Sequence, residues 1–209
     1  MCRHRRGKKV IAIKSPEELD GMRAAGKIAG LARQYAGTLV KPGVSTQQID
    51  EKVGQFIRDH NAIPSFLNYQ GFPRNICISI NSEVVHGIPG DRLIQQGDIV
   101  SVDVGALYKG FHGDTAETFA AGEISKEAQK LIDVTSQSFY QGLEQAKAGN
   151  RVGDIGHAVQ VYIEDFGFSA VRVLTGHGIG KNLHEEPEVK NYGRAGTGDT
   201  LRAGMCICI

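Results

Sequence analysis

"KPGVSTQQIDEKVGQFI", residues 41–57, aligns without gaps with "KAGNRVGDIGHAVQVYI", residues 147–163, at an offset of 106. Both stretches open on a lysine and a glycine and continue with apolar residues at helical spacing. Each stretch also follows another segment of helical periodicity, which begins at Ser15 in the first case and at Ser125 in the second. Because any two amphipathic helices align partway, the helical match alone leaves chance similarity open.

A second pair of segments strengthens the repeat. "GDIVSVD", which starts at Gly97, aligns with "GMCICI", which starts at Gly204, at an offset of 107. Both are a glycine followed by an apolar strand pattern. We therefore predict an α+β fold, with a helix–helix–strand–strand plan used twice and two related halves around an antiparallel sheet. In this alignment the counterpart of Asp103 would follow Ile209.

Four helices are expected from periodicity and end signals. The first has Ser15 as its N-cap, Pro16 at its first helical position and Glu18 completing a capping box. The other three are expected in residues 45–60, 125–146 and 152–168, each with apolar residues on one face. We treat residues 10–209 as a single domain.

Composition excludes several classes of protein. A net charge of +1 shows no overall bias toward nucleic acid, and no apolar stretch approaches transmembrane length. Residues 1–9 are basic and are expected to form a solvated tail, with contact to ribosomal RNA as the alternative. The apolar run that follows is too short for an export signal. The four cysteines include no CxxC pair, which favours a reduced, cytoplasmic compartment.

Two aspartates stand out in "SVDVGALYKGFHGDT", residues 101–115. Asp103 interrupts an apolar strand pattern, and Asp114 follows it after a glycine-rich turn. A tight turn around residues 107–110 would place both carboxylates on the same face of a hairpin, opposite or diagonal to each other. Like charges at that distance keep a proton or bind a cation between them. A hydrogen-bonded structural pair is the alternative.

Three histidines are candidates for the same site. His177 lies in the glycine-rich "TGHGIG", His86 ends "NSEVVH" before a turn, and His184 begins "HEEPEV". Taken singly, each is also compatible with a turn or surface histidine. Carboxylates with an imidazole suit Mn, Fe, Co or Zn. Glu185 or Glu186 could instead supply a site carboxylate, and their adjacency means that at most one faces the site.

The motifs "INSEVVHGIP", "IVSVDVGALYKGFHGDTAETF", "GHGIGKNLHEEP" and "NYG", in that order, resemble type I methionine aminopeptidases from Val10 to Ile209. The resemblance implies a pita-bread (creatinase/aminopeptidase) fold and removal of the initiator methionine from nascent proteins, with a preference for a small second residue. It implies two divalent ions (Co, Mn, Fe or Zn). By motif match, the implied metal ligands are Asp103, Asp114 and His177, the substrate-contacting and catalytic residues are His86 and His184, and the methionine pocket is lined by Tyr69, Phe72 and Cys77.

The sequence departs from the family's pattern of metal ligands in one respect. The family's remaining two ligands are glutamates, and in its pattern both come after the position of Ile209. An impaired fragment or a silent peptide-binding or protein-binding module is therefore the alternative function. A proline-specific peptidase of the same fold is the rival enzyme, although such enzymes usually carry a large N-terminal domain. We expect a monomer without a membrane span.

Overall fold

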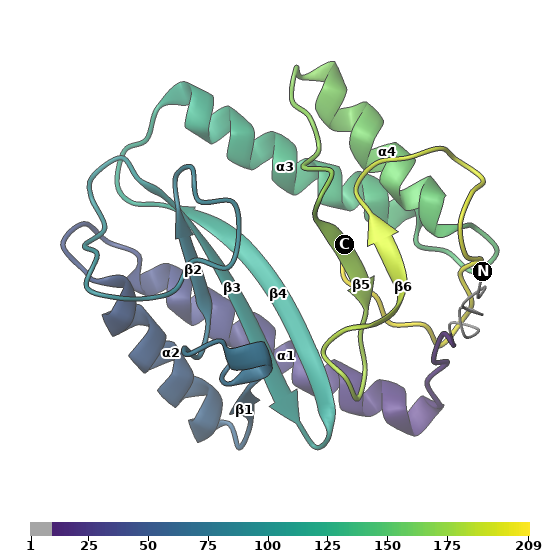
Figure 1. Ribbon diagram of the computed structural model, residues 1–209. Coiled ribbons are helices and arrows are strands. Elements are labelled where there is room, and N and C mark those ends of the chain that lie inside the picture. Colours follow the sequence, from purple (N-terminus) through teal and green to yellow (C-terminus); the bar gives the residue numbers. More distant parts are fainter. Residues whose placement is uncertain (1–9) are drawn as a thin grey trace, which may run out of the picture. The chain divides into compact units, whose positions relative to one another are not determined.

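The computed structural model describes residues 10–209, so the basic tail expected at residues 1–9 lies outside the described residues. The chain divides into two compact units: a central unit, residues 17–136, and a terminal unit, made of residues 137–209 with the segment before Glu17. The helices are α1 (Pro16–Leu39), α2 (Thr46–Asp59), α3 (Lys126–Gln145) and α4 (Val152–Asp165) (Figure 1). All four expected helices are confirmed, and α1 begins at the proline expected in its first position.

The central unit contains a four-stranded antiparallel sheet made of β1 (Ile63–Pro64), β2 (Cys77–Ile80), β3 (Ile99–Tyr108) and β4 (Phe111–Ala120). β3 pairs with β4 along one edge and with β1 and β2 along the other. Lys109 and Gly110 form the turn between β3 and β4, both with positive φ (49° and 84°), as a two-residue hairpin turn requires. The hairpin is therefore confirmed, with its turn at the end of the expected stretch.

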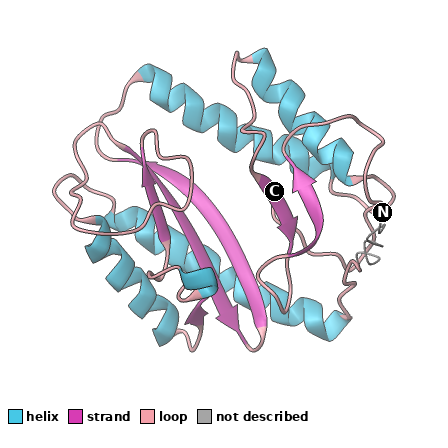
Figure 2. Cartoon of the chain, in the orientation of Figure 1, coloured by secondary structure: helices cyan, strands magenta, loops and turns pink. Residues whose placement is uncertain are grey.

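One face of this sheet is covered by α1 and α2 (Figure 2). Val100, Val102 and Val104 of β3 are fully buried on that face. β4 approaches α1 so closely that a Cβ at Gly113 would lie 2.5 Å from the backbone of Ala25. Because side chains alternate along a strand, Asp103 and the residues in phase with it point to the other face.

The terminal unit has a two-stranded sheet of β5 (Thr175–Gly178) and β6 (Glu185–Lys190), packed against α4. Residues 206–208 run beside β5, where the Ile179 N–H donates to the Cys206 carbonyl at 3.1 Å. A bridge between Gly178 and Ile207 adds to this pairing. The strand expected from Gly204 is therefore an extended segment that pairs with β5.

Backbone hydrogen bonds confirm the internal repeat. Helices α2 and α4 have 14 residues each and start 106 positions apart. The loops that precede them are held by matching bonds, in which one partner is displaced by 106 and the other by 107. These bonds are Gly43 N to Ile94 O (2.8 Å) with Gly149 N to Leu201 O (3.0 Å), and Ile94 N to Val44 O (2.9 Å) with Leu201 N to Asn150 O (2.7 Å).

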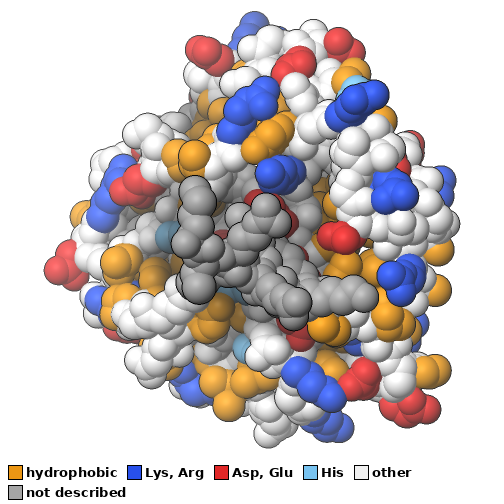
Figure 3. Space-filling view, turned by 45° about the vertical axis from the view of Figure 1, so that its right-hand side comes forward, with side chains coloured by type: hydrophobic (Ala, Val, Ile, Leu, Met, Phe, Trp, Pro, Cys, Tyr) orange, Lys and Arg blue, Asp and Glu red, His pale blue; other side chains and the backbone are white. Residues whose placement is uncertain are grey.

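Acidic and basic side chains are interspersed on the face shown in Figure 3, which agrees with the near-neutral net charge. Within residues 10–209 none of the helices has the length and apolar character needed to cross a bilayer.

Candidate metal centre

Asp103 and Asp114 lie on neighbouring strands of the central unit. Asp103 is opposite Ala116 and Asp114 is opposite Gly105, so the two carboxylates are diagonal neighbours on one face of the sheet. The prediction that they share a face is confirmed. Burial raises the pKa of Asp103 well above its ordinary value, and the charge of Asp114 and a hydrogen bond to it act in the same direction. The backbone N–H of Val104 opposes them.

One oxygen of this pair lacks a partner. Oδ1 of Asp103 is buried and accepts no hydrogen bond from any described residue. A buried, unsatisfied carboxylate oxygen is costly unless a proton or a cation compensates it. The pair therefore fits a divalent cation, which would neutralise both carboxylates at once.

Cys77 lies opposite Asp103 on β2 and is buried. Burial, followed by the charges of Asp103, Asp114 and Asp50, raises the pKa of the Cys77 thiol to about 12. The side chain is thus a neutral thiol at physiological pH. It can serve as an apolar wall beside the carboxylates.

Tyr69 and Phe72 belong to a tight segment at the edge of the same sheet. Tyr69 opens a short 3-10 helix (Tyr69–Gly71), and Phe72 follows it; both side chains are half-buried. The chain just before them reaches β3, since the Ser65 N–H donates to the Gly105 carbonyl at 2.9 Å. A Cβ at Gly105 would lie 2.7 Å from the side chain of Phe66, so this glycine makes room for the segment.

His86 is exposed and has a left-handed backbone conformation (φ 60°). Its position is set by Gly87, whose N–H donates to Ser79 Oγ at 3.1 Å and whose carbonyl accepts the Ile78 N–H at 3.0 Å. A side chain at Gly87 would collide with the Ile78 carbonyl. The residues next to His86 in the sequence include three exposed apolar side chains, namely Val84, Val85 and Ile88.

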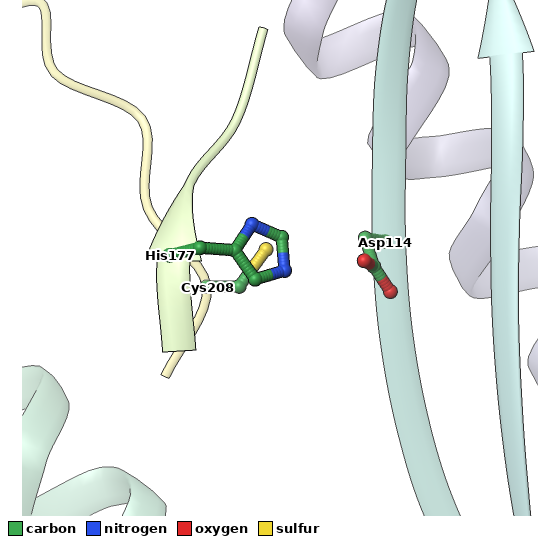
Figure 4. Close-up of side chains that lie close together, drawn as sticks. All are labelled: Asp114, His177 and Cys208. Carbon is green, nitrogen blue, oxygen red and sulfur yellow. The ribbon is translucent and has the colours of Figure 1, made fainter. Parts of the chain in front are cut away.

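His177 and His184 meet in the terminal unit. Their ring centroids lie 4.3 Å apart with an interplanar angle of 64°. Nδ1 of His177 lies 2.9 Å from the Gly178 carbonyl, so as a donor it leaves Nε2 as the nitrogen with a lone pair. Metal-binding histidines commonly anchor their other ring nitrogen in this way. Figure 4 shows the His177 ring beside Cys208 and also labels Asp114, which belongs to β4 of the central unit.

Sequence reasoning missed the partner of Glu185. Lys14 Nζ lies 2.8 Å from Glu185 Oε2, and the two side chains are only 5% and 12% exposed. Burial opposes ionisation of Glu185, but the Lys14 ammonium and the N–H groups of Asn182 and Lys181 outweigh it and lower the pKa of this carboxyl. Glu185 is therefore engaged in an ion pair. The residues are 171 positions apart, and no local signal links them.

Cys208 was also missed as a neighbour of His177. The strand pattern that begins at Gly204 does not indicate which residue lies opposite Cys208. Cys77, Cys206 and Cys208, the cysteines among the described residues, form no disulfide. The central unit thus offers two carboxylates, and the terminal unit offers an imidazole and a thiol; each of these is a donor that borderline divalent metals accept.

Comparisons with known proteins agree with this chemistry. Residues 20–209 match the model of metallopeptidase family M24. A methionine aminopeptidase of Clostridium acetobutylicum is 53% identical over 201 residues, which cover 96% of this chain and 80% of that protein. The crystal structure of methionine aminopeptidase from Rickettsia prowazekii superposes with a TM-score of 0.92 at 44% identity, over 94% of this chain and 79% of that one.

A prolidase from Pyrococcus furiosus has the same fold, with a TM-score of 0.80, but only 23% identity over 93% of this chain and 56% of that one. That likeness shows the fold alone. The chain belongs to the methionine aminopeptidases of metallopeptidase family M24 and has their pita-bread fold.

Proposed function

We propose that this protein removes the N-terminal methionine from nascent polypeptides by metal-dependent hydrolysis of the first peptide bond. Asp103, Asp114 and His177 are the proposed ligands of two divalent ions, taken from Co, Mn, Fe or Zn. What the ions supply when bound is Lewis-acid activation of a water molecule and of the scissile carbonyl. The observation that carries the proposal is the buried, unpaired Oδ1 of Asp103 beside Asp114.

Two histidines are the proposed substrate-contacting groups. His86 and His184 are both exposed and can reach a bound peptide. An imidazole can orient the peptide amine or amide, and it can donate a hydrogen bond to the carbonyl oxygen as negative charge develops there. The ring contact between His184 and His177 supports a position for His184 next to the reacting bond.

The methionine side chain is proposed to lie against Tyr69, Phe72 and Cys77. Two half-buried aromatic rings and a neutral thiol provide an apolar surface for an unbranched thioether. A narrow site would also reject large second residues by steric clash, which supports a preference for small ones. We further propose cytoplasmic location, a monomeric state and transient contact of the basic residues 1–9 with the ribosome.

The test is release of methionine from a Met-Ala-Ser peptide with Mn²⁺ or Co²⁺ present. Loss of partner residues outside the ligand shell costs metal sites about 10–100-fold, so Asp103→Ala and His177→Ala should lower turnover by more than about 100-fold. Elemental analysis should show a parallel fall in bound metal. Ser101→Ala, on the same face of β3, is the matched control and should change neither.

Unchanged metal content in Asp103→Ala and His177→Ala would contradict the ligand assignment. Peptide binding without methionine release from the unsubstituted chain would instead favour a peptide-binding module. That outcome would overturn the proposed activity.

A further inference from the structure

Cys208 is a potential metal ligand that the proposed centre leaves unused. Its backbone N–H donates to the His177 carbonyl at 2.8 Å, and the His177 N–H donates to the Cys208 carbonyl at 3.3 Å. Two residues that exchange both hydrogen bonds are directly opposite in an antiparallel pair, and their side chains share a face. Figure 4 shows the thiol beside the imidazole accordingly.

The two donors are close enough to share one ion. The ring nitrogen of His177 and Sγ of Cys208 lie within 4.8 Å of each other. Zinc binds imidazole nitrogen at about 2.0 Å and thiolate sulfur at about 2.3 Å, and at a tetrahedral angle these bonds place the two donor atoms about 3.5 Å apart. A small rotation of the thiol would bring both donors onto a tetrahedral ion, while the contact of Nδ1 with the Gly178 carbonyl holds the ring in place.

We propose that Cys208 is a thiolate ligand of the ion that His177 binds, and that it makes this ion Zn²⁺ or Co²⁺ in preference to Mn²⁺. The proposal rests on the proposed function, because it assumes that His177 binds metal. The sulfur–hydrogen bond is replaced by a sulfur–metal bond, and the proton goes to the solvent. Thiolate is a soft donor, which favours Zn²⁺ and Co²⁺ over the harder Mn²⁺.

The internal repeat supplies a natural comparison. Ser79 and Ser101 are opposite each other in the central unit, as His177 and Cys208 are in the terminal unit. Ser101, the counterpart of Cys208, has its Oγ 2.8 Å from Thr118 Oγ1, so the repeated backbone accommodates a hydroxyl where the terminal unit has a thiol. Cys208→Ser should therefore fold, with the backbone bonds of residue 208 retained.

The experiment is a Co²⁺ titration of the whole chain under a non-thiol reductant, followed by absorption spectroscopy. We expect visible d–d bands together with a near-ultraviolet thiolate-to-cobalt charge-transfer band. Cys208→Ser should lose the charge-transfer band and keep the d–d bands. Cys206→Ser is the matched control and should keep both, since it removes another thiol of the same segment.

A competition experiment measures selectivity. Cys208→Ser should weaken Zn²⁺ binding by about tenfold or more, because a soft ligand is lost, and should leave Mn²⁺ binding within about twofold. Cobalt d–d bands without a charge-transfer band, or a band that persists in Cys208→Ser, would overturn the proposal and leave the metal centre intact. Absence of all cobalt absorption would contradict the metal centre itself.

Discussion

The pair Ser79–Ser101 in the central unit and the pair His177–Cys208 in the terminal unit hold equivalent positions in the two repeats of the backbone. Ile80 pairs with Val100 next to the first, and Gly178 with Ile207 next to the second, in the same relative register. The serines serve structure, since Ser79 Oγ accepts the Gly87 N–H and Ser101 Oγ contacts Thr118. The backbone scaffold is therefore repeated while the chemistry of its side chains is not.

The loops that carry the two exposed histidines differ in the same way. "HGIP" from His86 and "HEEP" from His184 correspond at an offset of 98. After His86 comes Gly87, fixed by backbone approach to β2. After His184 comes Glu185, fixed by its ion pair with Lys14. The loop of His86 is thus held by backbone contacts and the loop of His184 by an ion pair. Substitutions should therefore affect the two loops differently.

The largest effect is expected at Asp50, which is 1% exposed in α2. Its carboxylate accepts the N–H groups of Asn75 (2.8 Å) and Ile76 (3.0 Å) and the side-chain amide of Asn75 (2.8 Å). Asp50→Ala leaves these buried donors unpaired at about 1–3 kcal/mol each, so the free energy of unfolding should fall by about 4 kcal/mol. Urea denaturation measures it.

The equivalent residue in α4, at an offset of 106, is Gly156, where a Cβ would lie 2.5 Å from the Lys190 carbonyl. Gly156→Ala should cost about 2 kcal/mol through this overpacking, a smaller and mechanistically distinct loss. The exposed neighbour Glu51→Ala is the control for Asp50 and should change little. A loss below about 1 kcal/mol in Asp50→Ala would show that water or rearrangement satisfies the donors.

The second effect concerns the ion pair. Removing one partner of a buried ion pair leaves the other charge buried and unpaired, so Lys14→Met should lower the free energy of unfolding by about 3 kcal/mol. The pKa of Glu185 is lowered in the folded protein, so the contribution of the pair is present above pH 4.5, the ordinary value, and is lost as the pH falls through the folded pKa. Urea denaturation between pH 5 and about pH 3 should therefore show a steeper loss in the original chain than in Lys14→Met.

Glu185→Gln with Lys14→Met is the matched double variant, and it should recover part of the loss because no buried charge remains. Identical pH dependence in the original chain and in Lys14→Met would contradict a stabilising pair.

Periodicity and end signals were sufficient for the four helices and for the hairpin of β3 and β4, but not for the contacts between distant elements. The start of α1 at Pro16 and the shared face of Asp103 and Asp114 follow from local spacing, and both are confirmed. The Lys14–Glu185 pair and the neighbours of Cys208 depend on how distant segments come together, which no local pattern specifies. Nothing in the sequence around Asp50 indicates that its carboxylate accepts hydrogen bonds from backbone N–H groups of a distant segment.

The smallest expected effect concerns the N-terminal caps of the equivalent helices α2 and α4, which differ in their chemistry. At α2, Ser45 Oγ accepts the Gln48 N–H (3.2 Å) and Gln48 Oε1 accepts the Ser45 N–H (2.9 Å), so no ionisable group is involved. At α4 the carboxylate of Asp154 accepts the N–H groups of Arg151 (2.7 Å) and Gly196 (2.6 Å). These two hydrogen bonds lower the pKa of Asp154.

A lowered pKa means that the Asp154 cap is complete above pH 3.8, the ordinary value, and is lost as the pH falls through the folded pKa. We therefore expect the protection of amides in the first turn of α4, measured relative to their intrinsic exchange rate at each pH, to fall on acidification, while the protection of the first turn of α2 in the same sample does not change. Asp154→Asn replaces the carboxylate with a neutral acceptor and should abolish the difference. Parallel loosening of both turns would mean that acid acts on the whole fold, and the two copies would then differ in their side-chain chemistry without differing in local stability.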